Sequence, residues 1–250
     1  MALMTMCGSE TITRDEIKNL PIAKATKTHH PVDNSRLVDL PHQALELNKF
    51  NIVDEAYAAK PDGSQFFGLL GLECKRDEAF NYTLGIRNCS DKKFRLNYVH
   101  GTDCMICDNL EISGEFIVAR KHTSKINDEL LGLVFNAVSK LGDIFEAKFD
   151  RIDKYKTIDL DSQLHQNDLT VRLADSGAIT YQQIPKVLDE YRNPRHEEFK
   201  DKNLFSYMQA VTETSKAKEE NRGVNHLNTF SRRSQIMHDM FAKEWSTELN

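Results

Sequence analysis

The feature that most constrains the fold is a change in the spacing of apolar residues near residue 122. Before this point, apolar residues form short runs of strand length separated by turn residues, as in residues 66–72 and 80–86. After it, apolar residues recur at steps of three and four, which is the spacing of one face of a helix. The chain therefore predicts an α+β protein in which a mostly antiparallel sheet, at about residues 50–122, precedes a helical half that packs on it.

The first part of the sheet-rich segment, residues 35–122, predicts a helix and then a meander of strands. Pro41 suits the first turn of a short helix over residues 41–49, because its missing N–H is not needed there. Pro61, Asp62 and Gly63 form a turn between strands, since proline presets φ and glycine accepts a positive φ. The strands expected on either side of this turn cover residues 51–59, 66–72 and 80–86.

The second part of this segment predicts an inserted helix followed by two strands. Ser90 and Asp91 are typical residues for a helix start, and Gly101 is typical of a helix end. The helix between them would bury Phe94, either Leu96 or Tyr98, and Val99. The two strands that follow are expected over residues 104–107 and 111–121.

On either side of the sheet-rich segment, the sequence predicts a loosely ordered arm over residues 1–34 and a helical half over residues 123–250. Thr13 and Glu16 have the spacing of a capping box, so one short helix is expected in the arm, near residues 13–19. Residues 35–250 are expected to form a single α+β domain. Its helical half is predicted to contain one long helix over residues 124–153 and shorter helices over residues 162–174, 181–191, 203–216 and 230–245.

The charge balance excludes two classes of protein. The formal net charge is −5 over 250 residues, which argues against a basic protein that coats DNA and against an acidic disordered tail. No apolar run approaches the roughly 18 residues that a membrane span needs, so no membrane association is expected. The first ten residues lack a basic segment followed by an apolar block, so we expect a cytoplasmic protein, in the host cytoplasm if a phage encodes it. Formation of a homo-oligomer is left open.

The motifs of common catalytic and metal sites are missing, so the sequence favours a non-enzymatic protein with no cofactor. It contains no phosphate-binding P-loop, no dinucleotide-binding glycine motif and no His-Glu-x-x-His motif. Cys104 and Cys107 have metal-ligand spacing, but a strand would point them to opposite faces, and free thiols are the preferred interpretation. Asp159 and Asp161, with Asp153 nearby, would suit Mg²⁺, but they lie in a polar linker between predicted helices, where acidic caps are common. His29, His30 and the stretch 196–198 lack partners at fixed spacing.

The segment from residue 84 to residue 95 is the most informative for function, because it predicts an anion site. A strand that ends in Arg87 and Asn88 and enters a helix capped by Ser90 would direct free N–H groups at one position, where a phosphate could bind. Tyr82 and Tyr98 lie close in sequence to these basic residues and would supply aromatic rings on which bases stack. The residues expected to bind an anion or nucleic acid are Arg87, Asn88, Ser90, Lys92, Lys93, Arg95, Arg120 and Lys121.

A purely structural interpretation of the same segment stays open. Asn88, Ser90 and Asp91 also form an ordinary turn and helix cap. The carboxylate of Asp91 would compete with a bound phosphate, because it is itself an anion at the same place. Lys92 and Lys93 would then be a solvated surface.

The same segment resembles the phage/plasmid-like protein family DUF932. The resemblance lies in the Gly-Ile-Arg-Asn run at residues 85–88, the Ser-Asp-Lys-Lys-Phe run at residues 90–94 and the later Cys-Asp-Asn-Leu and Ser-Gly-Glu runs. It extends to residues 203–214, where Gln209 stands at the position of the family's asparagine. The resemblance implies a protein of a phage, plasmid or other mobile element, and it implies no catalytic residue.

Three functional hypotheses follow from these observations. The leading one is a non-enzymatic protein of a mobile genetic element with a DNA-related role in replication, recombination or annealing. The alternative is an inhibitor or adaptor that binds a host protein, such as a component of a defence system. The third is an enzyme that depends on a metal or on a cysteine, for which Cys104 and Cys107 or Asp159 and Asp161 would supply the chemistry.

Overall fold

The computed structural model describes the backbone of residues 10–76, 80–104, 109–215 and 224–246. Side chains are described over the same ranges except for residues 102–116 and 224–231. Contacts within the chain divide it into two compact units, which are described separately. The first unit comprises residues 1–103, 115–142 and 222–224, and the second comprises residues 104–114, 143–221 and 225–250. The single domain expected over residues 35–250 stays a prediction.

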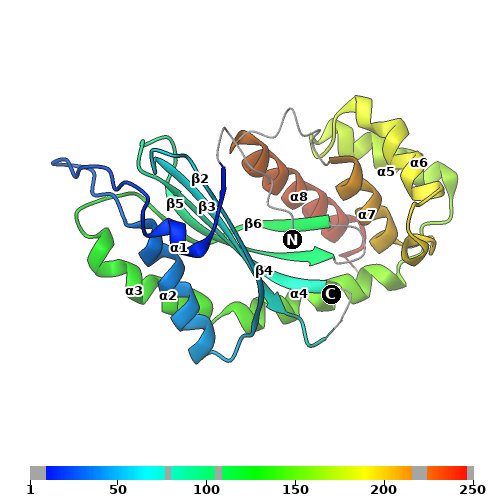
Figure 1. The fold of residues 1–250 in the computed structure, drawn as a ribbon. Coiled ribbons are helices and arrows are strands. Elements are labelled where there is room, and N and C mark those ends of the chain that lie inside the picture. The colour runs from blue at the N-terminus through cyan, green and yellow to red at the C-terminus, as the bar shows by residue number, and fades with distance from the viewer. Residues whose placement is uncertain (1–9, 77–79, 105–108, 216–223, 247–250) are drawn as a thin grey trace. The chain divides into compact units, whose positions relative to one another are not determined.

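A six-stranded antiparallel sheet forms the centre of the first half of the chain (Figure 1). Its strands lie side by side in chain order, so each connection leads to the neighbouring strand. The α+β class and the antiparallel sheet before a helical half are therefore confirmed. The strands are β1 (Glu10–Ile12), β2 (Ile52–Ala59), β3 (Gln65–Glu73), β4 (Phe80–Cys89), β5 (Leu96–Cys104) and β6 (Asn109–Arg120).

The turn between β2 and β3 has the chemistry that its sequence predicts. The side chain of Asp62 accepts a hydrogen bond from the N–H of Ser64 at 2.9 Å, and Gly63 has φ 67°. Beyond its φ, Gly63 is required by packing, because a Cβ at this position would lie 2.2 Å from the carbonyl oxygen of Pro21. The loop that contains Pro21 therefore lies directly against the β2–β3 turn.

The helix predicted between Ser90 and Gly101 is wrong, because the chain forms a short turn and then strand β5. Leu96, Tyr98 and His100 lie at alternate positions on one face of this strand and are all buried, and Asn97 on the other face is buried too. Their spacing also permits a helix, and the decision comes from pairing between β4 and β6 in the sheet. A strand position for this segment removes the helix N-terminus on which the predicted anion site depended.

Helix α2 (Asn34–Leu47) begins seven residues before the predicted helix, so Pro41 lies inside it and not at its first turn. The side chain of Asp33 caps this helix by accepting the N–H of Ser35 at 2.9 Å. A proline inside a helix leaves the carbonyl four residues earlier, that of Leu37, without its usual N–H donor. The hydroxyl of Tyr98 supplies a substitute donor at 2.9 Å.

The segment expected to be a loosely ordered arm contains regular structure from residue 10. Strand β1 pairs with the last three residues of β2, and helix α1 (Arg14–Ile17) follows with the capping box of Thr13 and Glu16 that its sequence predicts. Ile17 and Val32 expose 2% and 3% of their surface, so this segment contributes to the core of the first unit.

The long helix predicted over residues 124–153 is wrong, because α3 (Ile126–Val138) and α4 (Leu141–Thr157) are separate helices. The hydroxyl of Ser139 donates to the carbonyl of Asn136 at 3.0 Å, which competes with regular helical bonding at the break. Within the first unit, α3 packs against α2, and Arg36 donates to the carbonyl of Asn127 at 2.7 Å.

The second unit is helical apart from the first residues of β6, and aromatic side chains contribute to its core. The rings of Tyr155 and Phe241 meet edge to face with centroids 5.6 Å apart, as do those of Tyr191 and Tyr207 at 5.3 Å. The predicted helices are confirmed with shifted ends: α5 (Gln163–Asp175), α6 (Ile184–Arg192), α7 (Leu204–Ser215) and α8 (Val224–Glu244). Within the described ranges, none of the helices combines the length and the apolar character needed to cross a bilayer.

Candidate functional site

Asp91 occupies the centre of the predicted anion site, in the turn between β4 and β5. Its carboxylate accepts hydrogen bonds from the side-chain amide of Gln65 at 2.8 Å, from the N–H of Lys93 at 3.1 Å and from the thiol of Cys89. The ammonium group of Lys93 lies 3.2 Å from the same carboxylate. Burial raises the pKa of Asp91, but these hydrogen bonds outweigh it and bring the pKa down to about 2. The protein's own carboxylate therefore uses the donors that a phosphate would need.

Ser90 serves the turn and caps no helix. Its N–H donates to the carbonyl of Ser64 at 2.8 Å, which connects the β4–β5 turn to the β2–β3 turn. The prediction that Ser90 starts a helix is wrong for this reason. The competition from Asp91 that the structural interpretation anticipated is present.

Arg87 points into the protein and not to solvent. The residue exposes 8% of its surface, and its guanidinium carbon lies 3.7 Å from the centroid of the Phe94 ring. Phe94, from the turn, thus covers a cation that belongs to strand β4. Arg87 is in this position a structural residue of the first unit.

Asn88 is the centre of a buried polar network, which we call the Asn88 network and define by His29, Asn34, Asn88 and His122. The side-chain nitrogen of Asn88 donates to the side-chain oxygen of Asn34 at 2.8 Å and lies 3.4 Å from the carbonyl oxygen of Val32. Its side-chain oxygen therefore acts as the acceptor for Nε2 of His122, at 2.7 Å. This assignment places a hydrogen on Nε2 of His122, which donates to Asn88.

The two histidines of the Asn88 network connect segments that are distant in sequence. Nε2 of His29 lies 3.0 Å from the carbonyl oxygen of Ser90, and the rings of His29 and His122 have centroids 5.0 Å apart. The N–H of His30 donates to the carbonyl of His122 at 2.8 Å. Burial, together with the neighbouring His29, lowers the pKa of His122 to about 4. Sequence analysis missed this network, because nothing local marks His29 and His122 as partners.

The Asn88 network has one property of a metal site and lacks another. Nε2 of each imidazole lies within hydrogen-bond distance of an oxygen. In a metal-binding histidine, one ring nitrogen usually makes such a bond while the other nitrogen binds the metal. Among the residues that the structure describes, however, no three His, Cys, Asp or Glu side chains are grouped so that they could hold a metal ion.

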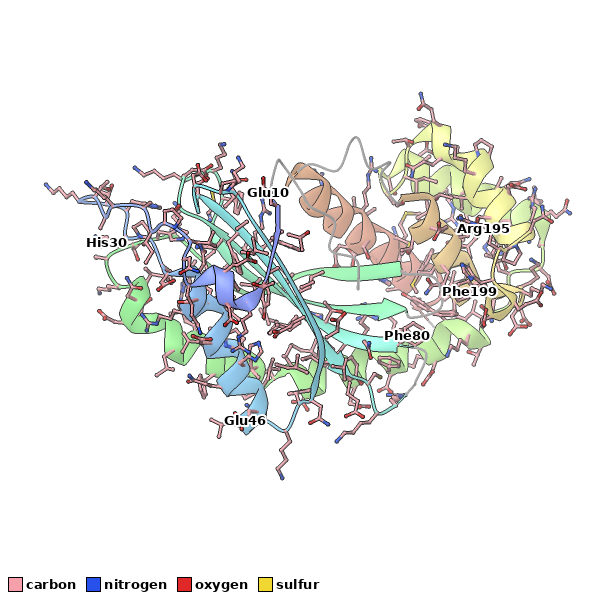
Figure 2. The ribbon with its side chains drawn as sticks, viewed as in Figure 1. Glu10, His30, Glu46, Phe80, Arg195 and Phe199 are labelled. Atoms are coloured by element: carbon pink, nitrogen blue, oxygen red, sulfur yellow. The ribbon has the colours of Figure 1, made fainter. Side chains whose placement is uncertain are left out.

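The exposed basic side chains near this network share one end of the sheet. An antiparallel meander places the β4–β5 turn and the C-terminal end of β6 at the same end, and the His29 and His30 contacts bring the loop before α2 to it. In Figure 2, His30 and Phe80, the first residue of β4, lie toward opposite ends of the sheet. We call this group the basic end; its exposed members are Lys24, Lys27, Lys92, Lys93, Arg95, Arg120 and Lys121.

Most cations of the basic end have no carboxylate partner. Lys93 pairs with Asp91, whereas none of the other members of the basic end forms an ion pair with any residue that the structure describes. Lys92 lies in the β4–β5 turn, is exposed and has φ 68°, a left-handed conformation. The predicted residues Lys92, Lys93, Arg95, Arg120 and Lys121 are thus exposed at one end, whereas Arg87 and Asn88 are buried.

A groove of about 630 Å³ lies elsewhere in the first unit, between α1, α2 and the start of β2. Beside it, Nε2 of His42 lies 3.1 Å from a carboxylate oxygen of Glu55, which also accepts the hydroxyl of Tyr57 at 3.0 Å. Nδ1 of His42 lies 3.2 Å from the guanidinium of Arg14. The lining residues are Arg14, Asp39, His42, Gln43, Glu46, Lys49, Phe50, Asn51 and Ile52.

His42 is not arranged as a general base in this groove. A guanidinium can only donate, so Nδ1 of His42 accepts from Arg14 and Nε2–H donates to Glu55. Burial lowers the pKa of His42, as does the charge of Arg14, although Glu55 opposes both. Because neither nitrogen is left to take a proton from a substrate, His42 does not act as a general base in this arrangement.

The remaining candidates from the sequence are structural or lie outside the described residues. Asp159 belongs to a short β-bridge with Asn203, and the ring of His196 packs edge to face on Phe199. Cys107 and the side chain of Cys104 lie outside the described residues. Tyr82 and Tyr98 expose 6% and 1% of their surface, so neither can stack on a base.

Comparison of the chain with protein-family models, with curated proteins and with solved structures finds no match. The class is therefore defined by the fold itself, an α+β protein with a six-stranded antiparallel meander. The resemblance to DUF932 stays a prediction.

Proposed function

We propose that this chain is a non-enzymatic protein of a mobile genetic element and binds DNA through the basic end of its sheet. The observation that supports DNA binding is the gathering of exposed lysines and arginines from three chain segments at one end, most of them without a carboxylate partner among the described residues. The mobile element is supported by the resemblance to DUF932 alone. A role in replication or recombination fits such a protein.

The negative net charge is compatible with this proposal and limits it. A net charge of −5 opposes binding along the whole surface, but the potential at a local group of cations decides whether a phosphate backbone is attracted there. Lysine and arginine contacts to phosphates release counterions, so the affinity should fall steeply with salt. The proposed contact with DNA is therefore local and does not extend along the whole surface.

The chemistry of the basic end favours double-stranded over single-stranded DNA. Sequence-independent binding of a single strand uses aromatic side chains on which bases stack. At the basic end, the ring of Phe94 covers Arg87, and Tyr98 is buried in the sheet. Contacts from cations to phosphates do not need unstacked bases, so a duplex is the better partner. Annealing of single strands receives less support than a role on duplex DNA.

The test is the salt dependence of binding to a labelled DNA duplex, measured by fluorescence anisotropy. The full-length protein should bind at about 50 mM salt and lose affinity steeply by about 200 mM. Replacing Lys92 and Arg95 by alanine should make the negative slope of log K against log salt shallower by about 1.8, since each lost contact removes about 0.9 from its magnitude. The matched control replaces Lys49 and Lys75, which are exposed at the other end of the sheet, before β2 and after β3, and should leave the slope unchanged.

One observation favours the alternative of a protein partner, and it lies in the second unit. Leu164 and Val171 are two turns apart on the same face of α5 and expose 80% and 43% of their surface, and Tyr181 exposes 64%.

If the protein fails to bind duplex DNA at about 50 mM salt, the proposal of DNA binding is wrong. A stoichiometric, nuclease-resistant partner that is lost in Leu164→Asp with Val171→Asp would then establish the alternative.

A further inference from the structure

The basic end is assembled from three segments that are distant in sequence, and the contacts between them are buried and polar. The first segment is the loop of residues 20–32, the second is the β4–β5 turn, and the third is the end of β6. Lysine and arginine side chains on separate loops bind a phosphate backbone well only if the loops are already held in place, because ordering them during binding costs free energy.

The Asn88 network makes the connections between all three segments. Asn88 lies in β4 directly before the turn, and its side chain binds His122, which follows Arg120 and Lys121 at the end of β6. The carbonyl of His122 in turn accepts the N–H of His30, and the His29 ring lies against the His122 ring. These contacts tie the loop of residues 20–32 and the β4–β5 turn to the end of β6.

The loop that carries Lys27 has its own turn, which the same network anchors. The N–H of Thr26 donates to the carbonyl of His29 at 2.8 Å, and the N–H of His29 lies 3.2 Å from the hydroxyl of Thr26. Lys27 is within this turn. The bond from Nε2 of His29 to the carbonyl of Ser90, at 3.0 Å, then fixes the turn to the β4–β5 turn.

We infer that Asn88 and His122 are positioning residues that hold the three segments of the basic end in one arrangement before DNA arrives. This inference rests on the proposed function, since it assigns these two residues to the same surface. Asn88 exposes only 2% of its surface, so it acts through the segments that it connects and not through contact with a ligand. The sequence predicts Asn88 as one of the residues that form the anion site itself.

The first part of the test uses two substitutions at His122 and compares their salt dependence. His122→Leu removes the donor to Asn88, whereas His122→Gln keeps an amide N–H near the position of Nε2. Every basic side chain of the basic end remains in both variants. If Arg120 and Lys121 lose their positions in His122→Leu, two phosphate contacts are lost. Raising the salt from about 50 to about 200 mM should then weaken binding of this variant to a labelled duplex by a factor about ten times smaller than for the parent. His122→Gln should keep the slope of the parent.

The matched control is Tyr98→Phe, which also removes one buried hydrogen bond between distant segments of the first unit. Tyr98 bonds to Leu37 and to no member of the Asn88 network, so this variant should lose stability and keep the slope of the parent. An equal change of slope in Tyr98→Phe and His122→Leu would show that lost stability alone weakens binding, and it would overturn the inference.

The second part of the test needs no DNA. Hydrogen exchange of the full chain should show faster exchange at the amides of Thr26, His30 and Ser90 in His122→Leu than in His122→Gln, with strand β3 unchanged in both. Unchanged exchange at these three amides would overturn the inference whether or not the protein binds DNA. Absence of binding by the parent would instead overturn the proposed function, while the exchange result still decides whether the network holds the segments.

Discussion

The hydroxyl of Tyr98 donates a hydrogen bond of 2.9 Å to the main-chain carbonyl of Leu37, across 61 residues of sequence. This carbonyl is the one that Pro41 leaves without a donor inside α2. A buried carbonyl without a partner is costly, so the tyrosine on strand β5 compensates for a proline in a helix. Two sequence features that looked independent are thus one interaction.

Tyr98→Phe should lower the free energy of unfolding by about 1–3 kcal/mol, because it leaves the buried carbonyl of Leu37 unpaired. In a Pro41→Ala background the same substitution should cost less, since alanine at position 41 restores an N–H for that carbonyl. Urea unfolding of the four proteins in this double-mutant cycle measures the difference. Equal costs in both backgrounds would contradict the assignment of Tyr98 as the substitute donor.

Gly63→Ala should destabilise the protein more than Gly177→Ala does. Both glycines have a positive φ, 67° and 80°, so each alanine pays about 1–2 kcal/mol of backbone strain. Only at Gly63 would the new Cβ also meet an atom, the carbonyl oxygen of Pro21 at 2.2 Å, whereas none of the atoms that the structure describes lies within 4 Å of the one at Gly177. Thermal unfolding of the two variants measures the two losses of stability. Equal losses would show that the loop at Pro21 moves to accommodate the new Cβ without a cost in free energy.

Acid should destabilise the protein through His122 between about pH 6.5 and pH 4. The pKa of this side chain falls from 6.5 to about 4 on folding, so in this interval the unfolded chain binds more protons than the folded protein. Stability is therefore greatest above pH 6.5 and decreases as the pH falls, by on the order of 3 kcal/mol. Denaturant unfolding at several pH values should show this loss, and it should be smaller in His122→Gln.

His42 contributes to the same pH dependence, because burial also lowers its pKa. His42→Gln is therefore the comparison variant, and it should keep the part of the acid effect that His122 supplies. The low pKa of Asp91, about 2, acts in a different interval, since its stabilising effect is lost only as the pH falls from about its ordinary value of 3.8 toward 2. A pH profile that is unchanged in His122→Gln would contradict the role given to His122.

Arg87→Ala should leave the salt dependence of DNA binding unchanged and lower stability. Its guanidinium lies under the ring of Phe94, where it makes a buried cation–π contact worth about 2 kcal/mol and is not presented to a phosphate. Anisotropy titrations and urea unfolding of the same variant separate the two effects. A slope that becomes shallower by about 0.9 would show that Arg87 turns outward to bind DNA, against its buried position in the structure.

Local chemistry predicted several elements of the fold correctly. The Asp62–Gly63 turn and the Thr13–Glu16 capping box form as expected, because each depends on bonds between residues at most three apart. The helix from residue 90 and the long helix from residue 124 are wrong, because apolar spacing alone did not distinguish a strand within a sheet or a break at Ser139. For the candidate site, the sequence predicted the basic residues around Lys92, and only the structure shows that Arg87 and Asn88 are buried.

The sequence by itself determined the α+β class, the change from sheet to helix near residue 122, and the run of cations around Lys92 and Lys93. These properties depend on the spacing of neighbouring residues, which is visible along the chain. Only the tertiary structure decided that Asn88 binds His122 and that His29 reaches Ser90, contacts between residues 34 and 61 positions apart. The physical reason is that a buried polar group takes whichever partner the fold brings to it, and that partner leaves no local pattern in the sequence.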